Sequence, residues 1–245
     1  LWSSEQGAEL PMGKHTLYDN GMKVAFIARW PGKIKPGSVS DALVQHVDVL
    51  PTFVDAAGGD YSPHMDGKSF LPILLGQKQT HHEAIYGCLP DKRAVRTGRF
   101  KLIRNLRPDQ PENMTYSPYR SKPMGRHMDH VRSWLPLAYK NPAVAKKLEW
   151  FKKRPPEEFY DLEKDPWELH NRIDDPVYAD QKEKMTALLE TWMQQQGDEG
   201  LKTKNEIKQW QSKQHKLGKG YYGHSQTPNY REVFPGRPKA KRSKQ

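Results

Sequence analysis

A carboxylate and a side-chain amide stand next to each other near the start of the sequence, at Glu5-Gln6, just before a glycine. If residues 1–4 form the end of a strand, both side chains lie at its carboxyl end, where α/β proteins place their sites. Carboxylate and amide oxygens are the ligands that hard cations such as Ca²⁺ and Mg²⁺ prefer. Lys14 follows in a polar segment that can bring it to an anionic group. The pattern indicates a cation site beside an anion-binding lysine, although each of these residue types is more often simply solvated.

The elements around these side chains have the pattern of a compact α/β segment. Residues 23–28 are mostly apolar and rich in strand formers, so they predict a buried strand. A helix is expected over residues 40–50, with Pro51 interrupting it. Two further helical stretches are expected after it, at 53–57, before a Gly-Gly pair, and at 69–75.

Residues 81–200 predict a smaller α+β unit. Strands at 94–96 and 100–104 flank Thr97-Gly98-Arg99, an arrangement typical of a β-hairpin. Apolar residues recur at helical spacing over 180–195, so we expect this helix to pack on the sheet. The other predicted elements are strands at 84–87 and 158–162, a loop over 107–123, helical stretches within 130–151 broken by Pro136 and Pro142, and a turn with a helix start at 164–170.

The charge of the chain is concentrated at its end. The 245 residues include 40 Lys and Arg against 29 Asp and Glu, a net charge of +11 that first suggests a polyanionic partner. Residues 201–245 hold twelve of the basic residues and two of the acidic ones. Because the first 200 residues are nearly neutral, the net charge belongs to a polar tail, which is expected to be disordered. Nucleic acid is therefore not the expected partner.

Cysteine and hydrophobic content exclude several protein classes. The single cysteine excludes a disulfide framework and a Cys-rich zinc module. The sequence has no apolar run of about 18 residues, so no membrane span is expected. Its first residues do not have the pattern of a signal peptide.

Several short motifs follow one another in a fixed order. They are Glu-Gln-Gly at 5–7, Gly-Lys-His-Thr-Leu-Tyr-Asp-Asn-Gly at 13–21, Arg-Trp-Pro-Gly at 29–32, Val-Asp-Val-Leu-Pro-Thr at 47–52, Asp-Gly-Lys-Ser-Phe-Leu-Pro at 66–72, Arg-Thr-Gly-Arg-Phe-Lys-Leu-Ile at 96–103, and Glu-Phe-Tyr-Asp-Leu followed by Asp-Pro-Trp-Glu-Leu-His-Asn within 158–171. This series resembles the C-terminal half of the type I, formylglycine-dependent sulfatases of the alkaline-phosphatase-like superfamily. The resemblance covers residues 1–197.

The resemblance implies roles for individual residues. In most members of the family the dipeptide is Asp-Asn or Asp-His and binds a divalent cation, usually Ca²⁺. Glu5-Gln6 carries the same donor groups, each on a side chain longer by one methylene. Lys14 corresponds to the lysine that contacts the sulfate of the substrate, where its charge stabilises the negative charge that develops in the transition state. Arg96 lies in the C-terminal subdomain, which makes it a candidate contact to the substrate.

The resemblance also implies that a part of the active site is missing from this sequence. The family's nucleophile is a formylglycine, made from the cysteine of a Cys-x-Pro-Ser-Arg motif upstream of the cation-binding dipeptide. Cys88 begins a similar run, Cys-Leu-Pro-Asp-Lys, but this run has Lys in place of Arg and follows the dipeptide. We therefore expect no nucleophile in this chain and no activity of the chain alone. Its implied partners are the upstream half of the same enzyme and a sulfated small molecule or glycan, at an extracytoplasmic location.

The implied fold is α/β. Residues 1–80 are expected to form the C-terminal part of a mixed-sheet catalytic domain. Residues 81–200 are expected to form the α+β subdomain, with a loop-rich insertion near 107–156. The basic tail over 201–245 completes the chain.

Other interpretations stay open at this point. The chain can be a catalytically inactive fragment that binds polyanions through its tail, or part of a phosphatase or phosphodiesterase of the same fold, although the Gly-Lys-x-Thr-x-Tyr-Asp run favours a sulfatase. His81-His82 either faces the substrate cleft or, as we expect, forms a solvated turn. Residues 116–126 are either a glycan-binding segment or a surface insertion, and Asn113 begins an N-glycosylation sequon.

Overall fold

The computed structural model describes residues 1–109, apart from 9, 11, 61, 63 and 64, and residues 133–203, 205, 206, 209 and 212. The stretch 116–126 and Asn113 lie outside the described residues, as does nearly all of the tail over 201–245.

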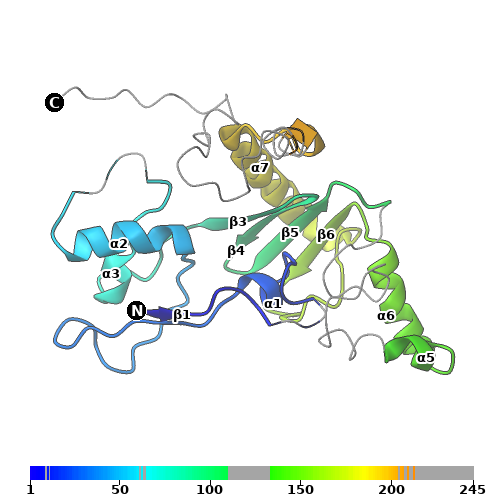
Figure 1. The fold of residues 1–245 in the computed structure, drawn as a ribbon, viewed down its shortest axis with the longest axis horizontal. Helices are drawn as coiled ribbons and strands as arrows, with labels where there is room; N and C mark the ends of the chain where they lie inside the picture. Colours follow the sequence, from blue (N-terminus) through cyan, green and yellow to red (C-terminus); the bar gives the residue numbers. More distant parts are fainter. Residues whose placement is uncertain are drawn as a thin grey trace.

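A four-stranded antiparallel sheet forms the centre of the structure (Figure 1). Its strands follow the chain in the order β3 (Ala84–Leu89), β4 (Lys92–Thr97), β5 (Phe100–Asn105) and β6 (Glu157–Asp161). The predicted hairpin is confirmed, and its turn is closed by the Thr97 hydroxyl, which accepts a hydrogen bond from the Phe100 amide at 3.0 Å. The expected α+β unit with a short antiparallel sheet is therefore present.

One face of this sheet packs against a long helix. Val95, Leu102 and Phe159 are fully buried and lie side by side on β4, β5 and β6, because the register pairs Val95 with Leu102 and Leu102 with Phe159. They contact Met185 and Leu189 of α7 (Ala179–Gln196), the helix expected over 180–195. The helix ends where Gly197 adopts a left-handed conformation, with φ 66°.

The other face of the sheet packs against the N-terminal segment. Side chains alternate along a strand, so the neighbours Ala94, Ile103 and Tyr160 point away from α7. They form a second buried cluster with Leu17 and Tyr18, which precede the short helix α1 (Asp19–Met22). Residues close to Lys14 in sequence are thus part of the core on this side of the sheet.

The predicted strand over 23–28 is only partly correct. Its regular part is β2 (Phe26–Ile27), which pairs antiparallel with β1 (Trp2–Ser3) in a separate two-stranded sheet. The prediction of a buried strand is wrong, because the Ile27 side chain is 60% exposed. With two strands of two residues each, this sheet is too small to cover its own faces.

The prediction of a helix over 40–50 is also wrong. Residues 40–45 are not helical, and the chain turns at a 3₁₀ segment, η1 (His46–Asp48), before α2 (Val49–Ala56). The cause is a capping box in which the Asp48 carboxylate accepts the Gln45 amide at 2.7 Å. Pro51 does not interrupt a helix but lies in the first turn of α2, where its missing N–H costs nothing. α3 (Leu71–Leu74) confirms the expected turns over 69–75.

Two prolines predicted to break helices instead lie near helix starts. Pro136 is inside the first turn of α5 (Trp134–Ala138), and Pro142 is the first residue of α6 (Pro142–Lys152). The predicted helix start at 164–170 is wrong, because the Asp165 carboxylate accepts the His170 amide at 2.7 Å and closes a turn. The next helical segment is η3 (Pro176–Tyr178), which leads into α7. None of the helices in the described part of the chain is long and apolar enough to cross a membrane.

Candidate functional site

Three of the residues singled out by sequence lie together. The Lys14 Nζ atom is 3.8 Å from Oε2 of Glu5, and the Gln6 amide donates to Oε1 of Glu5 at 3.2 Å. The Glu5 side chain is 80% exposed, whereas that of Lys14 is 22% exposed. An exposed carboxylate and amide therefore stand beside a mostly buried cation, which is an arrangement able to bind a divalent cation and an anion next to each other.

Backbone contacts through glycine hold this group together. The Gly7 amide donates to the Gly21 carbonyl at 3.1 Å, which joins the turn after Gln6 to α1. A Cβ added at Gly7 would lie 1.7 Å from the carbonyl oxygen of Asn20, so only glycine allows this approach. The Lys14 amide donates to the Ala8 carbonyl at 2.8 Å, and this bond places the lysine next to the dipeptide.

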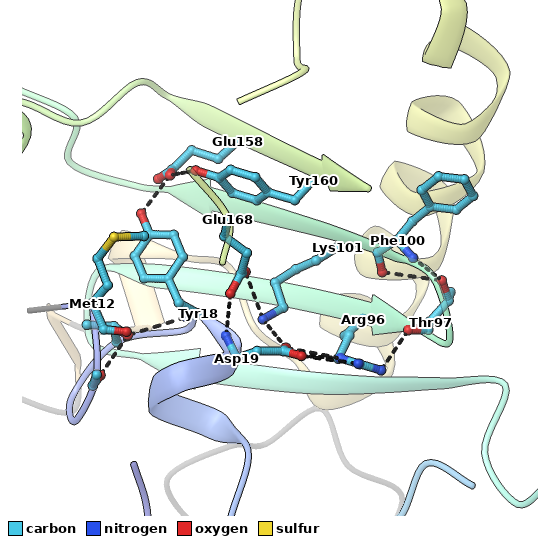
Figure 2. Close-up of polar contacts among 12 residues, drawn as sticks. Met12, Tyr18, Asp19, Arg96, Thr97, Phe100, Lys101, Glu158, Tyr160 and Glu168 are labelled. Atoms are coloured by element: carbon cyan, nitrogen blue, oxygen red, sulfur yellow. Dashed lines mark hydrogen bonds and ion pairs between the residues drawn. The ribbon is translucent and has the colours of Figure 1, made fainter. Parts of the chain in front are cut away.

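The segment carrying Lys14 is anchored to the sheet by a charged network (Figure 2). Asp19 of α1 accepts a two-pronged contact from Arg96, with Nε at 3.0 Å from Oδ1 and Nη2 at 3.1 Å from Oδ2. The Lys101 ammonium donates to the same carboxylate. Because Arg96 and Lys101 are cross-strand partners on β4 and β5, two cations of the sheet converge on a single carboxylate.

Glu168 completes the network from a distant part of the sequence. Its Oε1 is 2.9 Å from the Lys101 ammonium, and its Oε2 accepts the Asp19 amide at 2.6 Å (Figure 2). The side chain of Lys101 is wholly buried and that of Glu168 is 1% exposed. Glu168 adopts a left-handed backbone conformation, with φ 55°. A non-glycine residue there is strained, and here the strained residue makes both buried contacts.

Burial and neighbouring charges shift the pKa values of the Asp19 and Glu168 carboxyl groups in opposite directions. Burial raises the pKa of Asp19, but Lys101 and Arg96 outweigh it, and the net result is a lowered pKa. Burial raises the pKa of Glu168, and the opposing effect of Lys101 does not cancel it. Asp19 is therefore the group that carries the negative charge of the network most readily, which suits its position between two cations.

A second buried network lies on the same face of the sheet. Tyr18 and Tyr160 each donate a hydrogen bond of 2.6 Å to Oε2 of Glu158, and Arg154 donates to both oxygens of that carboxylate at 2.8 and 2.9 Å. Burial raises the pKa of Tyr160 far above its ordinary value, and the Glu158 charge adds to this. Tyr18 and Asp19 thus attach the segment that carries Lys14 to the sheet at two adjacent residues.

An open hollow of about 620 Å³ borders the site. Its wall includes Gln6, Asp19 and Arg96, and the Trp167 indole is 60% exposed at it. The complete lining is Ser4, Gln6, Gly7, Ala8, Asp19, Asn20, Lys23, Arg96, Gly98, Leu162, Glu163, Pro166 and Trp167. Arg96, expected to contact substrate, thus faces the hollow while its guanidinium is held by Asp19 and by the Thr97 carbonyl at 2.9 Å.

Two other candidates from the sequence lie elsewhere. Cys88 is on β3 opposite Arg93 and is exposed, but desolvation by its neighbours raises the pKa of its thiol, which disfavours the nucleophilic thiolate. His81 and His82 do not form a solvated turn: both imidazoles face the buried carboxylate of Asp48, at 3.6 and 2.9 Å. Neither histidine lines the hollow.

The sequence did not identify Lys101 and Glu168 as candidate site residues, and it included Asp19 only as part of the motif at 13–21. The one signal available for Lys101 was its place in the predicted strand over 100–104. Side chains alternate along a strand, so Lys101 and Leu102 point to opposite faces, and both faces are buried. Its partners come from residues 82 positions earlier and 67 positions later, distances over which local patterns carry no information.

Comparisons with known proteins match this chain to sulfatases. Residues 11–117 match the family model described as N-sulphoglucosamine sulphohydrolase, C-terminal. An ulvan-active sulfatase of Formosa agariphila is 36% identical over 210 residues, which are 81% of this chain and 38% of that protein. The N-acetylglucosamine-6-sulfatase of Homo sapiens is 47% identical over 68 residues, 27% of this chain and 12% of the relative. The chain thus spans well under half the length of the sulfatases it matches.

These similarities support the sulfatase family and confirm the predicted resemblance: the chain is similar to the C-terminal portion of sulfatases. Among solved structures, a protein in complex with its substrate D-glucosamine-2-N,6-O-disulfate aligns with a TM-score of 0.49 and 24% sequence identity. The alignment covers 73% of this chain and 29% of that protein.

Proposed function

We propose that this chain is part of a sulfatase that hydrolyses sulfate esters, and that it supplies one side of the active site. The observation that carries the proposal is the convergence of Lys14 with the Glu5-Gln6 dipeptide, held by the contact between Gly7 and Gly21. The sequence similarity to sulfatases over 81% of the chain supports the reaction class.

Lys14 is the residue we assign to the sulfate. A sulfate ester gains negative charge on its leaving oxygen and sulfuryl oxygens as the ester bond breaks, and a fixed cation stabilises that charge. The Lys14 side chain is 22% exposed, so its ammonium is largely shielded from water while it remains accessible from one side. Shielding strengthens its interaction with an anion compared with a lysine in open solvent.

Glu5 and Gln6 fit the divalent cation that sulfatases of this type use. Both present oxygen donors, and both lie at the end of β1, where they meet solvent. Ca²⁺ takes six to eight oxygen ligands, so these two residues would form one part of a shared site. When bound, the cation polarises the sulfate oxygens. The Gln6 amide would then turn its oxygen, instead of its nitrogen, toward Glu5 and the cation.

The nucleophile is assigned to a part of the enzyme outside this chain. The reaction needs a formylglycine, and the single cysteine here, Cys88, lies on the sheet with a raised thiol pKa. Residues 1–245 alone are therefore proposed to be inactive and to act with the upstream half of the same enzyme, at an extracytoplasmic location.

A sulfated glycan is the substrate class we propose. The hollow beside the dipeptide combines an exposed indole, that of Trp167, with polar groups such as Asn20 and Arg96, and this combination suits a sugar ring carrying hydroxyl groups. Relatives named for activity on ulvan and on N-acetylglucosamine 6-sulfate support this class.

The proposal can be tested in a chimera in which this chain replaces the matching 38% of the ulvan-active sulfatase. We expect the chimera to hydrolyse an aryl sulfate, and Lys14→Ala to lower kcat/KM by about 10²- to 10³-fold, the loss typical of one charge-stabilising group. Lys33→Ala, at an exposed loop lysine, serves as the matched control and should retain activity. A folded chimera without sulfatase activity, or equal effects of the two substitutions, would contradict the proposal.

A further inference from the structure

Asp48, His81 and His82 converge away from the hollow, and nothing in the proposed reaction uses them. Among the described residues they form a group whose donor atoms all lie within 4.8 Å of one another. We propose that these three side chains bind a transition-metal ion, with Zn²⁺ the best match to their chemistry. The site is distinct from the Ca²⁺ site at Glu5 and Gln6, since it offers two imidazoles and one carboxylate in place of oxygens alone.

The spacing of the donor atoms fits tetrahedral zinc. The carboxylate Oδ2 of Asp48 is 2.9 Å from Nε2 of His82 and 3.6 Å from Nε2 of His81. Zinc bonds of about 2.0 Å to nitrogen and oxygen place neighbouring ligand atoms of a tetrahedron roughly 3.3 Å apart. The two distances lie on either side of that value, so small side-chain rotations are enough to close the site around an ion.

His81 is the residue that points most strongly to a ligand. Its side chain is 9% exposed, and its Nε2 has no hydrogen-bond partner. The backbone of Lys68 also lies beside the ring, where it favours the protonated imidazole. A metal-binding histidine commonly donates its other nitrogen to a backbone carbonyl, which fixes the ring and directs the lone pair at the metal.

Asp48 is held in place before any ion arrives. Its side chain is 1% exposed, and its two oxygens accept backbone amides, from Gln45 at 2.7 Å and from Lys68 at 2.9 Å. One lone pair of Oδ2 remains, and it now faces His82. A metal ion would take the position of the proton that links these two groups.

The surroundings leave room for a fourth ligand. The His82 side chain is 18% exposed, so water can complete the tetrahedron from that side. Burial lowers the pKa of His81, and the charges of His82 and Lys68 lower it further. A bound ion would link the start of α2 to the residues before β3, two segments that lie 34 positions apart.

Calorimetric titration of the chain with Zn²⁺ tests this site. We expect a site that the double variant His81→Gln/His82→Gln weakens on the order of 100-fold, because each lost imidazole leaves a coordination position to water. His170→Gln, at a histidine that is 68% exposed on a turn, is the matched control and should leave the affinity unchanged. Equal Zn²⁺ affinity of the unchanged chain and the double variant would overturn the proposal.

A second measurement uses no variant and so does not depend on the variant's folding. Crystals of the unchanged chain grown with Zn²⁺ should show an anomalous peak at the zinc edge between Asp48, His81 and His82. Absence of a peak at that position overturns the proposal, whatever the titration shows. Ca²⁺ should give no peak there, because it prefers six or more oxygen ligands. These results are independent of sulfatase activity, so this site can fail while the proposed function stands, and the reverse.

Discussion

Arg96 and Lys101 face each other across β4 and β5, and both donate hydrogen bonds to the carboxylate of Asp19. Two like charges directly opposite on a sheet repel each other, and the Asp19 carboxylate between them compensates this repulsion, together with that of Glu168 on Lys101. The loop that carries Lys14 is therefore attached to the sheet, because Arg96 and Lys101 need the Asp19 carboxylate to compensate their charges.

Asp19→Asn should destabilise the chain strongly. The substitution leaves a wholly buried lysine with one carboxylate in place of two and leaves Arg96 without its charged partner. Removing one partner of a buried charge network costs about 3–5 kcal/mol. Chemical unfolding checks this, with Glu190→Gln as the control, because the carboxylate of Glu190 pairs with Arg104 at the surface and should contribute less than about 1 kcal/mol. Similar losses for both variants would show that the network does not anchor the loop.

Gly7→Ala should disrupt the site through the backbone. The added methyl would lie 1.7 Å from the Asn20 carbonyl oxygen, so the turn carrying Glu5 and Gln6 must separate from α1. Overpacking of this kind costs about 1–3 kcal/mol or more. Gly98→Ala is the matched control, because its Cβ would meet no atom within 4 Å. Thermal unfolding should separate the two variants, and an unchanged melting temperature for Gly7→Ala would count against this contact.

Glu5→Gln should weaken the response of the chimera to Ca²⁺. The change keeps the size of the side chain but removes its negative charge, and Ca²⁺ affinity depends steeply on the number of charged ligands. We expect the Ca²⁺ concentration for half-maximal activity to rise on the order of tenfold. Glu163→Gln is a suitable comparison, since that carboxylate lines the hollow next to the dipeptide but pairs with Arg99. If Glu163→Gln shifts the Ca²⁺ response as far as Glu5→Gln does, the dipeptide is not the cation ligand.

Acid should unfold the chain partly through Asp161. The hydrogen bond from Arg99 lowers the pKa of Asp161 below its ordinary value of 3.8, with a further contribution from Tyr178. Because the folded-state pKa is below that of the unfolded chain, this carboxylate stabilises the fold fully above about pH 3.8, and the contribution is lost as the pH falls through the folded-state pKa.

Unfolding free energies measured between neutral pH and pH 2 test this contribution. The loss of stability below pH 3.8 should be smaller in Asp161→Asn than in the unchanged chain. The profile of Glu163→Gln should run parallel to that of the unchanged chain, because its carboxylate meets the same Arg99 while 65% exposed. Parallel profiles for the unchanged chain and Asp161→Asn would refute the assignment.

The sequence predicted the C-terminal unit well because its signals are local. The hairpin around Gly98 depends on a four-residue turn, and α7 on a spacing of three and four residues, so both can be found within short windows. The prediction of a helix from Ser40 failed because the Asp48 side chain accepts the Gln45 amide, and the α-helix begins nine residues later, at Val49. Helix propensity could not reveal this cap, because the Asp48 carboxylate is also held by distant residues: it accepts the Lys68 amide and contacts the histidine pair.

The candidate site was only partly accessible from sequence. Glu5, Gln6 and Lys14 are candidates from the sequence because they carry recognisable chemistry and stand in motifs that resemble those of a known family. The groups that hold them in place, Lys101 and Glu168, were missed, since their role depends on which strand face they occupy and on contacts made across the fold.

The hydrogen bond between Asp19 and Glu168 joins residues separated by 149 positions. A ribosome adding 5–20 residues per second would need roughly 7–30 seconds to extend the chain from one to the other. For that interval the loop that carries Lys14 has emerged while the Glu168 carboxylate does not exist, and Lys101, once made, has only part of its charge compensation. The loop therefore reaches its full set of contacts late in synthesis, and truncation before residue 168 would remove one of the carboxylates that attach it to the sheet.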